Sequence, residues 1–169
     1  MPDATELELT AQELRDLDGN SVLDTEFHRG RAVLVVNPEK IRAVLAHLDA
    51  KGYTFLASLH GVDYYPDEPR LGVLYELLDM KRVDRISVKT RVPTDAPHID
   101  SVVERFPGAD FPEREVYDMF GVVFDGHPDM RRILMPEDYE GYPQRRDFPV
   151  GGEPVLFTFN EETSYGKNV

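Results

Sequence analysis

The chain of 169 residues contains no cysteine and no tryptophan. Without thiolates it cannot hold an ordinary iron–sulfur cluster, a cysteine-type zinc site, a disulfide or a thiol nucleophile. The sequence also lacks any run of about 18–20 apolar residues, the length that crosses a bilayer. Its first residues are acidic and polar, unlike a secretory signal. We therefore expect a soluble, cytoplasmic protein.

Positive charge is scarce, because 19 Lys and Arg residues face 32 Asp and Glu residues and the net charge is −13. Nonspecific binding to nucleic acids needs a surplus of Lys and Arg to neutralise phosphates. Anionic lipid surfaces would repel the chain for the same reason. The sequence also has no Gly-rich phosphate loop, no H-E-x-x-H and no G-x-S-x-G motif. Other proteins and small molecules remain as partners.

Hydrophobic periodicity predicts seven elements in the first part of the chain, in the order α-β-β-α-β-β-β. They are a helix opened by a capping box at Thr10 and ending near Asp18, strands over 22–28 and 31–36, a helix over 38–51, and strands over 53–62, 71–78 and 85–92. This order favours an α+β fold, a two-layer α/β sandwich with a mixed, largely antiparallel sheet. Such a sandwich requires one apolar stripe on the second helix, and Ile41, Val44, Leu45 and Leu48 supply it.

Two short helices are predicted next, over 99–106 and over 112–120. The residues from 125 onward are rich in Pro and Gly, which break regular structure. They also carry aromatic side chains, which need a surface to bury against. We therefore divide the chain into an α+β domain over 1–124 and an extended arm over 125–169 that binds partner subunits.

A dense run of charged and aromatic residues extends from Glu113 to Pro149. It closely resembles the signature of the 30-kilodalton subunit family of the proton-pumping NADH–quinone oxidoreductase, respiratory complex I. The signature positions are matched by Glu113, Arg114, Glu115, Asp118, Met119, Phe120, His127, Arg131, Arg132 and Leu134. The family-like run P-E-D-Y-E-G-Y-P-Q-R-R-D-F-P follows. One departure is Phe111-Pro112, where many members carry Trp.

The resemblance implies a member of the peripheral arm that carries no cofactor itself. Its partners would be the subunits with the terminal iron–sulfur cluster and the quinone pocket, and partner subunits would carry the iron–sulfur clusters and FMN. The complex would pass electrons from NADH to quinone and translocate protons. The chain would lie at the cytoplasmic side of the cell membrane, attached through the complex.

The charged residues of the signature are interpreted as a structural ion-pair network and an interface with partners. These residues are Glu113, Arg114, Glu115, Asp118, His127, Arg131, Arg132, Arg145, Arg146 and Asp147. Arg suits such a role because its planar guanidinium binds a carboxylate with two hydrogen bonds. No residue is assigned a catalytic, cofactor-binding or metal-binding role.

Four other interpretations stay open at this point. Paired carboxylates at 113–118 are compatible with acid/base catalysis. His127 with its two neighbouring Asp residues resembles a metal site, although a histidine that fixes a turn is favoured. The pair Arg145-Arg146 resembles a phosphate patch, although a salt bridge is favoured. His60 and Asp63 end a predicted strand and are compatible with a pocket edge, although a turn is favoured.

The leading hypothesis is therefore a cofactor-free scaffold subunit of complex I. A second hypothesis keeps the scaffold but places it in a membrane-bound hydrogenase or a quinone reductase fed by ferredoxin or a deazaflavin. A remote third hypothesis is a free-standing hydrolase that uses Glu113, Glu115 and His127.

Overall fold

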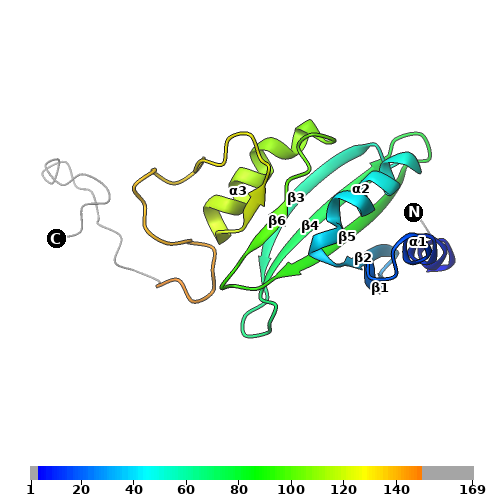
Figure 1. Ribbon diagram of the computed structural model, residues 1–169, viewed down its shortest axis with the longest axis horizontal. Coiled ribbons are helices and arrows are strands. Elements are labelled where there is room, and N and C mark those ends of the chain that lie inside the picture. Colours follow the sequence, from blue (N-terminus) through cyan, green and yellow to red (C-terminus); the bar gives the residue numbers. More distant parts are fainter. Residues whose placement is uncertain (1–3, 150–169) are drawn as a thin grey trace, which may run out of the picture.

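Five strands form one mixed sheet in the order β1-β2-β5-β4-β3, in a computed structural model that describes residues 4–149 (Figure 1). The helices are α1 (Ala4–Leu17), α2 (Ile41–Ala50) and α3 (Asp110–Phe120), with 3-10 turns η1 (Pro38–Lys40) and η2 (Pro107–Ala109). The strands of the sheet are β1 (Val22–His28), β2 (Arg31–Val36), β3 (Phe55–Asp63), β4 (Leu71–Asp79) and β5 (Asp84–Val92). Two further strands, β6 (His98–Asp100) and β7 (Val123–Asp125), pair with each other in parallel.

The five-stranded sheet is largely antiparallel, as the sequence predicts. The pairs β1–β2, β3–β4 and β4–β5 are antiparallel, whereas β2–β5 is parallel. Parallel neighbours need a crossover connection, and here α2, β3 and β4 lie between β2 and β5 in the chain. The predicted fold class, an α+β two-layer sandwich with a mixed sheet, is confirmed.

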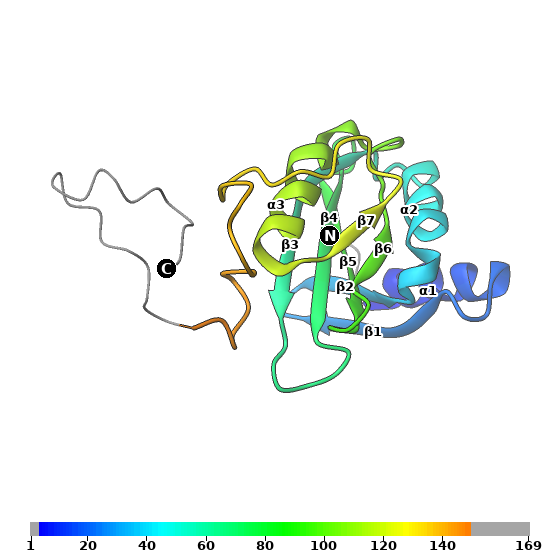
Figure 2. The same ribbon diagram turned by 60° about the vertical axis from the view of Figure 1, so that its left-hand side comes forward.

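The core lies between one face of the sheet and the helices (Figure 2). Alternate residues of β4 are fully buried there, from Leu71 to Leu77. The predicted apolar stripe of α2 is buried with them. The apolar face of a helix, which repeats every 3.6 residues, thus packs on the apolar face of a strand, which repeats every 2 residues.

The predicted helix over 99–106 is wrong. Ile99 belongs to β6, and the residues after it form turns. The reason is the pairing of β6 with β7, which places Ile99 opposite Phe124 and keeps its backbone extended. The carboxylate of Glu113 accepts a hydrogen bond from the backbone N–H of Val102 at 2.8 Å and joins the following turns to α3. The apolar side chains that suggested a helix are still covered, since Val102 and Phe106 are buried in the turns. Burial at these spacings is thus achieved by turns, one of them closed by the Phe106 N–H donating to Val102 O at 2.8 Å, and not by a continuous helix.

Other element boundaries move by smaller amounts. α1 begins at Ala4, and Thr10 is not its cap but a buried residue inside it. Its hydroxyl oxygen instead accepts a hydrogen bond from Lys51 Nζ at 3.1 Å. The helix starts early because Leu7 extends the buried stripe by one turn. β3 begins two residues later than predicted, at Phe55, and α3 begins two residues earlier, at Asp110.

Residues 126–149 contain no helix or strand, in agreement with the predicted loss of regular structure after 125. Figure 2 shows this segment, coloured yellow to orange, leaving β7 and passing α3 before it extends beyond the sheet. Residues 150–169, the rest of the predicted arm, lie outside the described residues. Within 4–149, no helix has the length and apolar character needed to span a membrane.

Candidate functional site

Helix α3 carries the signature residues at the point where the sheet domain meets the segment 126–149. Its C-terminal end is fixed by Gly121, which adopts a left-handed conformation (φ 77°) and donates its N–H to Tyr117 O at 2.8 Å. Glycine accepts this conformation without steric cost. α3 packs on β3 so closely that Gly61 has the ring of Phe120 where a Cβ would lie.

Asp118 is the best-bonded carboxylate of α3, and its side chain is fully buried. Its Oδ1 accepts a hydrogen bond from Arg132 Nη1 at 2.7 Å. Its Oδ2 accepts three consecutive backbone N–H groups, those of Ile133, Leu134 and Met135, at 2.7–3.0 Å. Burial alone would raise the pKa of Asp118, but these donors outweigh it and lower the pKa. The loop 132–135 is thereby fixed to the helix.

Arg114 holds the same loop from its other side. Its Nε and Nη2 donate to the carbonyls of Arg131 and Arg132 at 3.1 and 3.2 Å. The side chain thus binds backbone carbonyls, although its i, i+4 spacing to Asp118 suggests an ion pair. One helix therefore holds the N–H groups of the loop with a carboxylate and its carbonyls with a guanidinium. We call this arrangement the α3 clamp.

Arg132 extends the α3 clamp along the chain. Its Nη2 donates to the carbonyl of Gly141 at 3.0 Å, and its guanidinium lies over the rings of Tyr139 and Tyr142. These are two of the aromatic residues that led us to expect a covering surface for the arm. The arm itself supplies part of this covering surface, because Tyr139 also stacks on Phe148.

Glu113 does not join the ion-pair network in which the sequence places it. Its carboxylate is buried and accepts hydrogen bonds from Ser101 Oγ at 2.6 Å and from Val102 N–H. Burial raises the pKa of Glu113, and the two hydrogen bonds only partly oppose this. The residue therefore joins α3 to the turn after β6.

The residues of the hydrolase hypothesis differ in burial, and none of them lines the cavity beside α2. Glu113 and His127 are buried, whereas Glu115 is exposed. A cavity of about 620 Å³ lies between α2 and residues 101–106, and none of the three lines it. Acid/base chemistry requires groups that reach a common substrate, so this arrangement does not support it.

His127 fixes a turn, as favoured from the sequence. Its Nδ1 accepts a hydrogen bond from the N–H of Asp129 at 3.0 Å, so the proton of the neutral ring lies on Nε2. Nε2 faces the carbonyl of Asp110 at 3.2 Å. Within residues 4–149, no group of three or more His, Asp and Glu side chains is placed to hold a metal ion.

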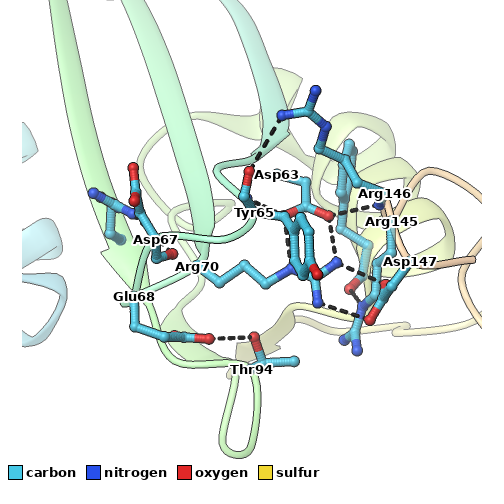
Figure 3. A network of polar contacts seen from close by, with 11 residues as sticks. Asp63, Tyr65, Asp67, Glu68, Arg70, Thr94, Arg145, Arg146 and Asp147 are labelled. Carbon is cyan, nitrogen blue, oxygen red and sulfur yellow. Dashed lines mark hydrogen bonds and ion pairs between the residues drawn. The ribbon is translucent and has the colours of Figure 1, made fainter.

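A second clamp joins the end of the segment to the β3–β4 connection, and Figure 3 shows Arg70 at its centre between Asp63 and Asp147. Arg70 binds Asp63 through Nε at 2.7 Å and Nη2 at 2.6 Å. It binds Asp147 through Nη1 at 2.8 Å and Nη2 at 2.6 Å. The Arg70 side chain is 7% exposed and that of Asp147 is 53% exposed. We call this group the Arg70 clamp.

The electrostatics of the Arg70 clamp follow from its geometry. The hydrogen bonds from Arg70 hold the pKa of Asp63 well below its usual range and also lower the pKa of Asp147. The backbone N–H of Arg146 adds a hydrogen bond of 2.7 Å to Asp63 Oδ2. A phosphate patch at 145–146 is not favoured, because Arg145 donates to the carbonyl of Phe120 at 2.7 Å and burial lowers its pKa.

The side chains of two exposed signature residues take no part in either clamp. Glu115 is exposed on α3. Arg131 is exposed as well and pairs with Asp129 through hydrogen bonds of 2.6 and 2.7 Å. His60, considered as a pocket edge with Asp63, is an exposed residue of β3, while Asp63 belongs to the Arg70 clamp.

The residues of both clamps belong to a region that matches a known protein family. Residues 34–154 match the family described as "Respiratory-chain NADH dehydrogenase, 30 Kd subunit". The chain belongs to this 30-kilodalton subunit family. It is 45% identical over 149 residues to the corresponding subunit of the NADH-quinone oxidoreductase of Roseiflexus castenholzii, and the alignment covers 86% of each chain. The family resemblance of the signature is confirmed.

Solved structures carry the fold of the 30-kilodalton family as well. The trypsin-resistant fragment (1–134) of Nqo5 superposes with a TM-score of 0.63 at 38% identity, covering 73% of this chain and 98% of that chain. A chain of the membrane-bound sulfane sulfur reductase, an archaeal respiratory membrane complex, has a TM-score of 0.70 at 27% identity and covers 84% and 85%. Both clamps lie inside the matched residues 34–154.

The sequence does not predict the role of Arg70 as the centre of a clamp in this member of the 30-kilodalton family. Arg70 stands in a polar loop with two prolines and no local periodicity. Its partner Asp147 is 77 residues away. The available signal was limited to Asp63, a carboxylate at the end of an apolar strand, which needs a partner if the strand end is buried.

Proposed function

We propose that the chain is the 30-kilodalton-type subunit of an NADH–quinone oxidoreductase and acts as its scaffold, without binding an electron carrier itself. The observation that carries the proposal is the family match over residues 34–154. The absence of cysteine from the whole sequence supports it, because iron–sulfur clusters would then reside in partner subunits.

The physical basis of a scaffold is a rigid surface. The two clamps bind residues 132–147 through buried or half-buried charges, at the two ends of a segment without regular structure. Ordering such a segment before assembly removes an entropic cost that association would otherwise bear. The chain can thus present its irregular segment to neighbours in one conformation.

The proposed neighbours are the subunits with the quinone pocket and the terminal iron–sulfur cluster. The chain would associate with the membrane through these subunits, at its cytoplasmic side. The division into a domain over 1–124 and an arm over 125–169 that binds partners is part of the same proposal.

A second assembly is kept as an alternative because of one observation. The fold also occurs in the membrane-bound sulfane sulfur reductase, a respiratory complex of another name. A scaffold that never touches the electron donor suits either machine, including a hydrogenase or a ferredoxin-fed or deazaflavin-fed quinone reductase.

The test is a native purification. The chain is tagged in its own host, membranes are solubilised gently, and the purified material is assayed for iron and for NADH:quinone activity. Iron with inhibitor-sensitive quinone reduction by NADH is the expected result. Iron with hydrogen, ferredoxin or sulfane sulfur activity would favour the alternative, and an iron-free single chain would refute both.

A truncation after Phe124 tests the arm. The truncated chain is expected to be lost from the complex, and its incorporation at normal yield would refute the arm's role. The variant Arg70→Gln complements the truncation, because it releases Asp147 from the Arg70 clamp and leaves the chain at full length.

A further inference from the structure

Large apolar side chains are exposed around the α3 clamp. Leu134 is 61% exposed and Phe111 is 63% exposed, and Ile133 is also exposed. Two of them, Ile133 and Leu134, are adjacent residues of the loop that Asp118 binds. Contiguous apolar groups at a surface mark interaction sites more often than scattered ones do.

This exposure does not come from a loose loop. The N–H groups of Ile133 and Leu134 both point to Asp118 Oδ2, a carboxylate oxygen with no exposure to water. The backbone that carries the two exposed side chains is therefore held in one conformation. Rigid apolar anchors bind with less loss of entropy than flexible ones, so such loops suit recognition.

Phe111 joins the same surface through the helix. Phe111, Glu115 and Asp118 follow the i, i+4, i+7 spacing and lie along one face of α3. At 1.5 Å per residue, Phe111 lies about 10 Å along the helix from Asp118 and its loop. Glu115 stands between them on this face and is exposed. Phe111 and the loop bound to Asp118 are thus parts of one surface along this face of α3.

The charge around this surface is negative. Glu137, Asp138 and Glu140 are exposed and follow the apolar pair within six residues, with no Lys or Arg among residues 133–140. The basic residues of the loop are neutralised, because Arg131 pairs with Asp129 and Arg132 pairs with Asp118. Arg114 of α3 has its guanidinium bound to the loop carbonyls, which leaves the carboxylates in excess. Positively charged side chains of a partner would complement this arrangement.

We propose that this surface docks a segment of a partner protein of the complex that carries apolar side chains flanked by Lys or Arg. We call it the docking patch, with Phe111, Ile133 and Leu134 at its centre and Glu115, Glu137, Asp138 and Glu140 as its rim. The proposal rests on the proposed function, because it requires that the chain is part of a larger complex. It assigns the exposed signature residue Glu115, which neither clamp uses, to partner recognition.

Two other occupants fit the charges poorly. An anionic lipid surface is repelled by four carboxylates at the rim. A second copy of this chain would bring a second acidic rim against the first, and like charges across an interface are unfavourable. A basic, apolar protein segment meets both requirements of the patch.

The first experiment compares two leucines of equal exposure. Leu134 and Leu9 are both 61% exposed, and Leu9 lies on α1, outside the patch. Tagged chains with Leu134→Ser or Leu9→Ser are expressed in the native host, and the other subunits retained per chain are measured during a salt wash. Leu134→Ser is expected to weaken retention about tenfold or more, the effect of losing one buried leucine, and Leu9→Ser to leave it unchanged.

The second experiment tests the rim. The triple variant Glu137→Gln, Asp138→Asn and Glu140→Gln keeps side-chain size and removes charge. Its retention is expected to fall at low salt and to depend less on salt than that of the wild type. The control, Glu39→Gln with Asp95→Asn and Glu104→Gln, removes three charges elsewhere and is expected to match the wild type.

The third experiment identifies the occupant in the purified complex. A photoreactive amino acid is placed at position 134, with position 9 as its control, and cross-linked peptides are sequenced by mass spectrometry. A peptide of another subunit with apolar side chains beside Lys or Arg is expected. Cross-links to lipid, to a second copy or to an acidic peptide, or none beyond the control, would refute the proposal.

The two proposals fail in different ways. If the wild-type chain purifies without other subunits, the proposed function is wrong. If the wild type retains its partners and Leu134→Ser retains them equally well, only the docking patch is wrong. Thermal unfolding of the full-length Leu134→Ser chain is expected to match the wild type, which separates a docking defect from a folding defect.

Discussion

Arg70, in the connection between β3 and β4, binds Asp147 through two hydrogen bonds of 2.6 and 2.8 Å across 77 residues of sequence. The same guanidinium binds Asp63 with two more. A guanidinium has five N–H donors in one plane, and this geometry allows it to hold two carboxylates at once. Arg70 thus joins the end of an irregular segment to the sheet, together with the hydrogen bond from the Arg146 N–H to Asp63.

The Arg70 clamp predicts unequal costs for its members. Arg70→Ala leaves the buried Asp63 carboxylate without its main partner, and we expect the free energy of unfolding to fall by about 3 kcal/mol. Asp147→Asn changes a half-exposed partner, and we expect a loss below about 1 kcal/mol. Urea unfolding of the full-length chain, followed by circular dichroism, measures both. Equal losses would show that the buried pair is not the centre of the clamp.

The α3 clamp predicts protected amides. In the wild type, hydrogen exchange at Ile133, Leu134 and Met135 should be slow, because all three N–H groups bind Asp118. Asp118→Asn removes the charge and one acceptor, so exchange should accelerate about tenfold or more at these positions. Asp129→Asn is the matched control, since Asp129 pairs with the exposed Arg131. Slow exchange in Asp118→Asn would contradict the clamp.

The pH dependence of stability should have two parts of opposite sign. The pKa values of Asp63, Asp118 and Asp147 lie below the ordinary value of 3.8, so the unfolded chain takes up protons first in acid. Their contribution is complete above about pH 4 and is lost as the pH falls further. The pKa of Glu113 lies above 4.5, so its unfolded form releases a proton first and stability falls as the pH rises from there.

Glu113→Gln isolates the second part. The amide oxygen can accept the Val102 N–H, and the amide nitrogen can donate to Ser101 Oγ, so both contacts can be kept, with the direction of the Ser101 hydrogen bond reversed. Unfolding free energies at about pH 5 and about pH 8 are compared for the variant and the wild type. The variant should gain stability relative to the wild type as the pH rises. A constant difference between the two proteins would argue against the raised pKa.

The contact between β3 and α3 predicts a steric effect. A Cβ at Gly61 would lie 2.4 Å from a carbon of the Phe120 ring, whereas a Cβ at Gly108 would have no atom within 4 Å. We expect Gly61→Ala to cost about 1–3 kcal/mol of stability by overpacking. Gly108→Ala should be close to neutral. Thermal unfolding of both variants provides the measurement, and a neutral Gly61→Ala would mean that α3 can shift away from β3.

The sequence by itself determined the five strands of the main sheet, the second helix and the family, but not β6 and β7. β1 and β2 begin and end at the residues that hydrophobic periodicity predicts, because the side-chain period is a local property. The signature from Glu113 to Leu134 identified the family for a similar reason, since it places many residue types at fixed spacings. Glu113 shows the limit, because the motif indicated its position but not its buried partners, Ser101 and Val102.

Only the tertiary structure decided which charges meet. Arg70 and Asp147 are brought together by the path of the chain around β3 and β4, and neither has a local pattern that names the other. Tertiary structure also places the N–H groups of the loop 133–135 at Asp118. It likewise makes Ile99 part of β6, where the sequence predicts a helix. Apolar burial can be satisfied by a helix, a strand or a turn, whereas a buried carboxylate needs particular donors. The folded chain alone brings those donors to Glu113 and Asp118, so no local pattern could predict them.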